Sequence, residues 1–149
     1  MHSSDTRQSL YAQVTSRIIA ELEEGRLPWV KPWDADLLCI PPQQAFPEPI
    51  NWYRTALHEL GHWTGHETRL GRDQSGMFGS SSYAREELVA ELASAFTCAS
   101  LSINPTVRHA DYVGSWLSVL RADDKAIFRA ASAASKAADH LLAFQGAAA

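Results

Sequence analysis

The sequence predicts an α+β domain that is mainly helical and carries one small β-sheet. Three observations lead to this fold class. Apolar residues recur at helical spacing through most of the chain, and only one short segment has the composition of a strand. In addition, 46% of the 149 residues are hydrophobic, which is enough to bury a core.

The first third of the chain holds one predicted helix, an irregular stretch and the strand candidate. Apolar spacing predicts a helix over residues 6–24, which Gly25 ends. Residues 27–49 contain six of the seven prolines and should be irregular. Within them, residues 36–40 read Asp-Leu-Leu-Cys-Ile and form the strand candidate. Because two prolines follow directly, this strand should lie at a sheet edge.

The rest of the chain should form four helices joined by polar or proline-containing turns. Gly65 should end the first of them, and residues 67–82 are polar and glycine-containing, which is typical of a loop. The serines at 80–82 are N-cap candidates for the next helix, which Asn104-Pro105 should break. The four helices are expected over residues 51–64, 83–102, 107–120 and 124–144.

Charge and hydropathy narrow the range of functions. The net charge is -4, the sequence pI is about 5.8, and no block of Lys or Arg stands out. This balance does not favour nucleic-acid binding, which depends largely on Lys and Arg contacts with phosphates. The first ten residues have no basic region followed by an apolar run. No apolar stretch approaches the roughly eighteen residues that span a bilayer. We therefore expect a cytoplasmic protein without a membrane partner.

Residues 58–62 read His-Glu-Leu-Gly-His, and this run carries the most specific chemistry in the chain. In the predicted helix, His58 and His62 share one face, so both imidazoles can reach the same metal ion. Glu59 lies at the edge of that face and can touch a metal-bound water without being a ligand. Zinc lowers the pKa of its water, and the carboxylate takes the proton as the water attacks a carbonyl. The motif predicts a zincin-type metallohydrolase site with Zn²⁺ as its cofactor.

Gly61 is unexpected inside this motif, because a glycine in a helix interior costs roughly 1 kcal/mol relative to alanine. The residue is not there for its helix propensity. We expect it to allow close packing of the helix against another backbone.

A catalytic zinc site needs a third protein ligand in addition to the two histidines. The longer pattern HExxHxxGxxH fails at its last position, where this chain has Thr68. A later helix offers Glu87 and Glu91, which are four residues apart and share a face. This resembles the gluzincin arrangement, so we assign Glu87 as the third ligand. Glu91 would hold a ligating imidazole by its other ring nitrogen. Spacing alone leaves the swapped assignment open.

Hydrolysis at such a site usually needs a donor that stabilises the oxyanion. His109 and Tyr112 are three residues apart in the predicted helix 107–120 and can face one cleft, so we predict catalytic roles for them beside Glu59. Tyr83 and His66 are further candidate donors.

Three longer runs resemble a known family. They are HELGHWTGHETRLGRD, YAREELVAELASAF and the segment 109–142. These runs resemble the zincin-like metallopeptidase domain of ArdC-type antirestriction proteins, with similarity over roughly residues 35–144. The resemblance implies that residues 35–149 form a zincin-like domain with an active-site helix and a glutamate helix. It also implies Glu59 as the catalytic glutamate, a ligand from the EELVAE segment, and an origin on plasmids or other mobile elements.

The opening run YAQVTSRIIAELEEGRLPWVKPWD resembles the start of the family's N-terminal domain, which is associated with single-stranded DNA binding. In this chain the metallopeptidase part follows almost at once. Residues 1–34 are therefore interpreted as a shortened remnant of that domain, a helix plus a linker.

Two functions follow from these observations. The first is a zinc-dependent metallopeptidase-like hydrolase, in which Glu59 activates a zinc-bound water to attack a peptide or protein substrate. The alternative is an antirestriction or DNA-associated binding module in which the metal mainly holds the fold. Single-stranded DNA would be the partner in that case.

Overall fold

The computed structural model describes residues 38–106 and 113–146, all within the unit Ala35–Ala149. The helix expected over residues 6–24 and the proposed N-terminal remnant lie outside the described residues. The elements that the structure describes are η1 (Gln43–Ala45), α2 (Ile50–Trp63), α3 (Ser81–Ser100), α4 (Val113–Ala122) and α5 (Ala126–Leu142).

The described residues contain no β-strand, so the small β-sheet expected from the sequence is wrong. Of the strand predicted over residues 36–40, only 38–40 are described, and they belong to no strand. An extended segment becomes a strand only where a neighbour completes the hydrogen-bonded ladder. The two prolines that follow have no N–H to donate. The chain turns instead into η1, where the Ala45 amide donates to the Pro42 carbonyl at 2.8 Å.

Local sequence signals place the helix ends well. The bounds of α2, α3 and α5 lie within two residues of those predicted. Ser80 caps α3, because its hydroxyl accepts a hydrogen bond from the backbone N–H of Tyr83 at 3.2 Å. At the other end of α3, Ser102 has a φ of 56° and the chain leaves the helix before Asn104 and Pro105. The expected beginning of the fourth helix falls in residues 107–112, outside the described ranges.

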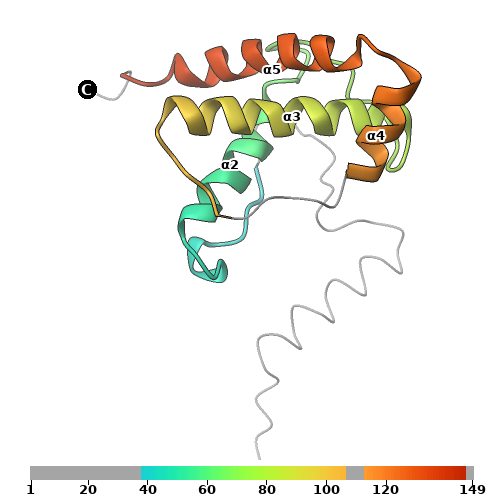
Figure 1. The fold of residues 1–149 in the computed structure, drawn as a ribbon. Helices are drawn as coiled ribbons and strands as arrows, with labels where there is room; N and C mark the ends of the chain where they lie inside the picture. Colours follow the sequence, from blue (N-terminus) through green and yellow to red (C-terminus); the bar gives the residue numbers. More distant parts are fainter. Residues whose placement is uncertain (1–37, 107–112, 147–149) are drawn as a thin grey trace, which may run out of the picture. The chain divides into compact units, whose positions relative to one another are not determined.

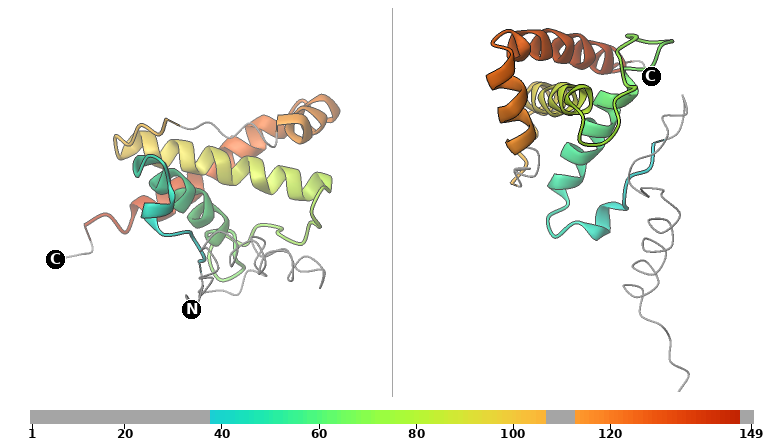
Figure 2. Two further views of the ribbon diagram at one scale, coloured as in Figure 1. Left: turned by 90° about the horizontal axis from the view of Figure 1, so that it is seen from below. Right: turned by 90° about the vertical axis from the view of Figure 1, so that its right-hand side faces the viewer.

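Helix α3 lies between α2 and α5, as the views in Figures 1 and 2 show. The α3–α5 contact is built mainly from small side chains. Ala93 of α3 and both Ala134 and Ala137 of α5 are completely buried, with Leu88 and Val89 in the same cluster. Because interaxial distance depends on the side chains at the contact, alanines let two helices pack closely. This packing fixes α3 as a rigid support.

Gly61 sets how closely α2 approaches α3. A Cβ at this position would lie 3.2 Å from both the Cα and the carbonyl oxygen of Ala90, and 3.4 Å from the Cβ of Ala93. The expectation that this glycine packs against another backbone is therefore confirmed. The contact brings the HELGH run of α2 next to the acidic segment of α3.

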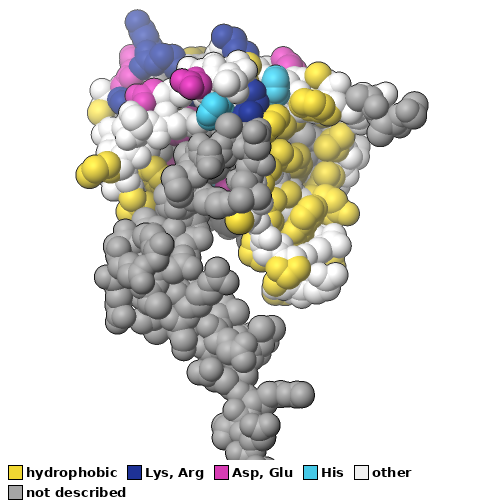
Figure 3. Space-filling model, turned by 180° about the vertical axis from the view of Figure 1, so that it is seen from behind, with side chains coloured by type: hydrophobic (Ala, Val, Ile, Leu, Met, Phe, Trp, Pro, Cys, Tyr) yellow, Lys and Arg dark blue, Asp and Glu magenta, His cyan; other side chains and the backbone are white. Residues whose placement is uncertain are grey.

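The surface of the described residues is mixed in character. On the face in Figure 3, hydrophobic side chains form a band on one side, and basic, acidic and histidine side chains lie together along the top. The described residues on this face show no continuous basic strip, which is in keeping with a net charge of -4. Within residues 38–106 and 113–146, no helix has both the length and the apolar character that a bilayer crossing requires.

Candidate metal centre

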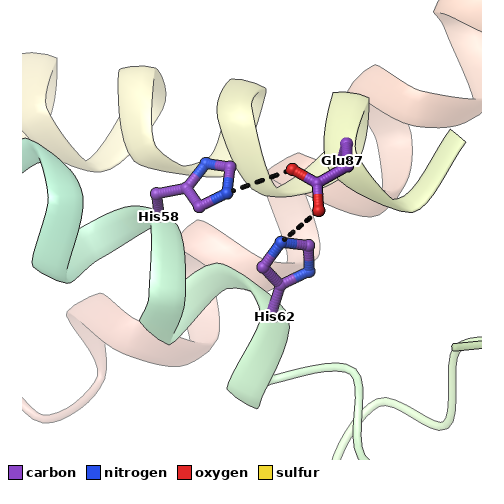
Figure 4. Close-up of side chains that lie close together, drawn as sticks. All are labelled: His58, His62 and Glu87. Atoms are coloured by element: carbon purple, nitrogen blue, oxygen red, sulfur yellow. Dashed lines mark ion pairs between the residues drawn. The ribbon is translucent and has the colours of Figure 1, made fainter. Parts of the chain in front are cut away.

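Helices α2 and α3 bring three potential ligands together. His58 and His62 come from successive turns of α2, and Glu87 comes from the first half of α3. One ligand atom from each residue lies within 4.8 Å of the other two. Both imidazoles point toward the same carboxylate in Figure 4. The Nε2 atom of His58 lies 3.3 Å from Oε2 of Glu87, and the Nε2 atom of His62 lies 3.3 Å from Oε1.

Each imidazole also meets a second carboxylate at its other ring nitrogen. The Nδ1 atom of His58 lies 3.3 Å from Oε2 of Glu91, and the Nδ1 atom of His62 lies 3.3 Å from Oε1 of Glu86. A carboxylate on Nδ1 favours the tautomer with a proton on that nitrogen, which leaves the Nε2 lone pair for a metal ion. The geometry therefore separates Glu87, on the Nε2 side, from Glu91, on the Nδ1 side.

Glu86 is a candidate functional residue that sequence reasoning missed. It is buried, and besides His62 it accepts hydrogen bonds from Arg72 and Gln74. Its position directly before Glu87 was the only signal, and that signal is weak. Consecutive helical residues point about 100° apart, so placing Glu87 on the face toward α2 does not by itself place Glu86 there. Arg72 and Gln74 lie in a segment that the sequence predicted only as a polar loop.

The buried ion pairs change the pKa values of the site. Burial lowers the pKa of His62, but hydrogen bonds with Glu86 and Glu87 outweigh it and raise that pKa to about 9. Burial raises the pKa of Glu87, but its contacts with His58 and His62 hold that pKa well below the usual range. Without a metal ion, the site therefore holds a protonated His62 between two carboxylates at neutral pH. A divalent cation can take the place of this positive charge.

Glu59 lies beside His58 on α2 and is half-buried. Burial raises the pKa of its carboxyl group above the usual range, the charges of His58 and His62 oppose that shift, and Glu87 adds to it. A carboxylate with a raised pKa is a better proton acceptor near neutral pH. The electrostatics of Glu59 thus suit a general base.

The other predicted donors are not in this cluster or cannot be placed. His109 and Tyr112 lie outside the described residues. His66 turns toward Thr68, whose hydroxyl lies 2.9 Å from its Nδ1 atom. The ring of Tyr83 packs against Phe78, with 5.3 Å between ring centroids.

The chemistry of the three grouped side chains fits a divalent metal ion. Two imidazole nitrogens and one carboxylate are a common ligand set for zinc. Three protein ligands also leave an open position, which distinguishes catalytic from structural zinc sites. The carboxylates on both Nδ1 atoms supply the outer hydrogen bonds that metal-binding histidines usually make.

Comparison with known proteins identifies the family to which the chain belongs. The sequence profile of a family described as zincin-like metallopeptidase matches residues 11–133. The chain belongs to this zincin-like metallopeptidase family. The resemblance to ArdC is confirmed by the crystal structure of the antirestriction ArdC protein from the R388 plasmid, in its Mn(II)-bound form. That structure is 41% identical, has a TM-score of 0.65, and is matched over 74% of this chain and 42% of its own. The metal-free ArdC structure is 44% identical with a TM-score of 0.60, over 72% of this chain and 39% of its own.

Two curated relatives are much longer than the stretch over which they match this chain. A DNA primase TraC of Escherichia coli is 50% identical over 111 residues, which is 74% of this chain and 10% of the primase. The uncharacterized protein y4eC of Sinorhizobium fredii (strain NBRC 101917 / NGR234) is 46% identical over 112 residues, which is 74% of this chain and 36% of that protein. The chain thus spans only a minor part of the proteins it resembles.

Proposed function

We propose that the chain is a zinc-dependent metallopeptidase-like hydrolase of the ArdC antirestriction type. One observation carries the proposal, namely that the carboxylate of Glu87 faces the Nε2 atoms of both His58 and His62 at 3.3 Å. These three residues would be the protein ligands. The His₂Glu set favours zinc. Other divalent ions accept the same donors, and the ArdC relative was solved with Mn(II) bound. The experiment must therefore also identify which ion the protein binds.

Each neighbouring residue has a role that its environment supports. When bound, the metal supplies Lewis-acid chemistry, which polarises a carbonyl and makes water more acidic. Glu59 takes a proton from the attacking water and returns it to the leaving amine, a role that its raised pKa favours. Glu91 holds the Nδ1 proton of His58, so that Nε2 stays directed at the ion. His109 and Tyr112 are proposed as the donors that stabilise the oxyanion.

The decisive variant is Glu59→Gln, which keeps the shape of the side chain and removes its basicity. Glu67→Gln is the control, because Glu67 is exposed in the turn after α2. Hydrolysis of a library of fluorescence-quenched peptides and zinc content would be measured on both. Glu59→Gln should retain zinc and lose roughly 10²–10⁴-fold in rate, the usual contribution of a general base. Cleavage at the wild-type rate by Glu59→Gln, or no cleavage by the zinc-loaded wild type, would count against the proposal.

The alternative is an antirestriction or DNA-associated binding module in which the metal is mainly structural. The descriptions of the relatives, an antirestriction protein and a DNA primase, favour it. In that case Glu59→Gln should keep full antirestriction activity, while His62→Ala, which removes a ligand, should lose it. Binding of a labelled single-stranded oligonucleotide at low salt tests the DNA version directly. No binding at low salt would exclude it, because phosphate contacts are strongest there.

A further inference from the structure

We propose that Arg72 and Arg54 are positioning residues, each of which orients one of the two metal-binding histidines through a glutamate. The inference rests on the proposed metal site and goes beyond it, because it assigns roles to two arginines outside the ligand set. It also explains why the buried carboxylate of Glu86 and the half-buried carboxylate of Glu91 can remain beside the imidazoles without being ligands themselves.

The first chain of contacts runs from Arg72 through Glu86 to His62. The guanidinium of Arg72 donates from Nε to Oε2 of Glu86 at 3.0 Å and from Nη2 to Oε1 at 2.7 Å. Oε1 is also the atom that lies 3.3 Å from Nδ1 of His62. A two-pronged arginine–carboxylate pair fixes both oxygens in one plane. Glu86 therefore cannot turn away from the imidazole while Arg72 is in place.

Arg72 is itself anchored to the helix that carries the histidines. Its Nη1 donates to the hydroxyl of Thr64 at 2.9 Å, and its Nη2 donates to the carbonyl of Gly61 at 2.7 Å. Gly65 leaves the space that this requires, since a Cβ there would lie 2.7 Å from Nη2 of Arg72. The Arg72 side chain is only 11% exposed. The guanidinium of Arg72 thus joins the end of α2 to Glu86 of α3. Because the pair is largely buried, it should hold the two helices together more firmly than an exposed ion pair, which contributes little to stability.

Gln74 reinforces the same contact from the same loop. Its side-chain amide nitrogen lies 2.7 Å from the carbonyl of His62 and 3.0 Å from Oε1 of Glu86. A Cβ on Gly65 would lie 2.5 Å from this nitrogen, so the glycine serves both loop residues. The loop after α2 is therefore built to hold Glu86 against His62.

The second chain runs from Arg54 through Glu91 to His58. Arg54 lies one turn before His58 on α2 and pairs through Nη2 with Oε1 of Glu91. The other carboxylate oxygen of Glu91 lies 3.3 Å from Nδ1 of His58. Only one prong is used here, and Nη1 of Arg54 is buried without a hydrogen-bond partner among the residues that the structure describes. Glu91 is therefore less firmly fixed than Glu86, and Arg54 should contribute less than Arg72.

Zinc affinity, measured by competition with a chromophoric chelator, tests the inference. Arg72→Gln should weaken zinc binding by up to roughly 10–100-fold, the range for direct partners of ligating histidines, because Arg72 acts through the direct partner Glu86. Arg72→Lys keeps the charge without the planar fork, so it should recover only part of the loss and serves if Arg72→Gln folds poorly. Arg54→Gln should have a smaller effect. Arg69→Gln is the control. It removes another arginine at the same helix end, whose Nε donates to the backbone carbonyl of Trp63 at 2.6 Å.

A second measurement separates failure of this inference from failure of the metal site. The ¹⁵N and ¹H resonances of the His62 imidazole would be recorded on metal-free protein. Arg72→Gln should change the Nδ1–H signal, and Arg69→Gln should not. If the wild type bound no zinc but this signal still responded to Arg72→Gln, the proposed function would fail and the positioning role would stand. Wild-type zinc affinity and unchanged imidazole signals in Arg72→Gln would overturn the positioning role.

Discussion

Replacing Gly61 with alanine should weaken the fold and the metal site together. The added Cβ would lie 3.2 Å from two backbone atoms of Ala90, so α2 and α3 must move apart by a few tenths of an ångström. Overpacking of this kind costs about 1–3 kcal/mol. The gain in helix propensity from glycine to alanine is about 1 kcal/mol and offsets part of that cost. We therefore expect a net destabilisation of about 1 kcal/mol.

The same movement should reduce zinc affinity, because His58 and His62 lie on α2 and Glu87 lies on α3. Sites of this kind need their side chains held within about 0.5 Å of the productive geometry, so we expect a loss of roughly tenfold. Urea unfolding of the metal-free protein and a zinc competition titration measure the two effects separately.

Gly114→Ala is the matched control for this substitution. Gly114 lies on α4, and a Cβ there meets no atom of the described residues within 4 Å. Alanine at this position should be neutral or stabilise by up to about 1 kcal/mol, with no change in zinc affinity. The reasoning is refuted if Gly61→Ala proves as stable as Gly114→Ala and binds zinc as tightly as the wild type.

Three further predictions concern the ligands, the pH dependence and the helix cap. Glu87→Gln should weaken zinc binding more than roughly 100-fold, which is the upper range for residues that only hydrogen-bond a ligand, whereas Glu67→Gln should leave it unchanged. If Glu87→Gln and Glu67→Gln bound zinc equally well in a chelator competition, Glu87 would not be a ligand. The folded-state pKa of His62 is raised from 6.5 to about 9, so its contribution to the stability of the metal-free protein is fully present below pH 6.5 and is lost as the pH rises to about 9. Zinc affinity should rise over the same interval, because zinc binding releases the His62 proton. Thermal unfolding measured across this pH range with and without zinc tests both trends, and the absence of either would contradict the prediction. Ser80→Ala removes the cap of α3 and should cost about 1 kcal/mol in urea unfolding; an unchanged midpoint would contradict the capping role.

The features that could be predicted from sequence are those set by local spacing. The HELGH run specifies a helix and a shared face for His58 and His62 without any long-range information. Glu87 and Glu91 share a helix for the same reason, and Gly61 indicated a close backbone contact through its poor helix propensity. The structure brings these elements together through the contact of α2 with α3.

The features that sequence reasoning missed depend on contacts between distant segments. Arg72 and Gln74 reach Glu86 across 14 and 12 residues, and no local pattern marks that pairing. The expected β-sheet was wrong for a related reason, because a segment such as residues 38–40 becomes a strand only beside a partner that its own sequence does not specify. The roles of His109 and Tyr112 stay predictions.

Titration of zinc into the metal-free protein tests the central claim most directly. Wild-type protein should bind one zinc ion per chain, and His62→Ala should lose that binding while remaining folded by circular dichroism. Absence of zinc binding in the wild type, or an unchanged binding curve for His62→Ala, would contradict a metal site built on His58, His62 and Glu87.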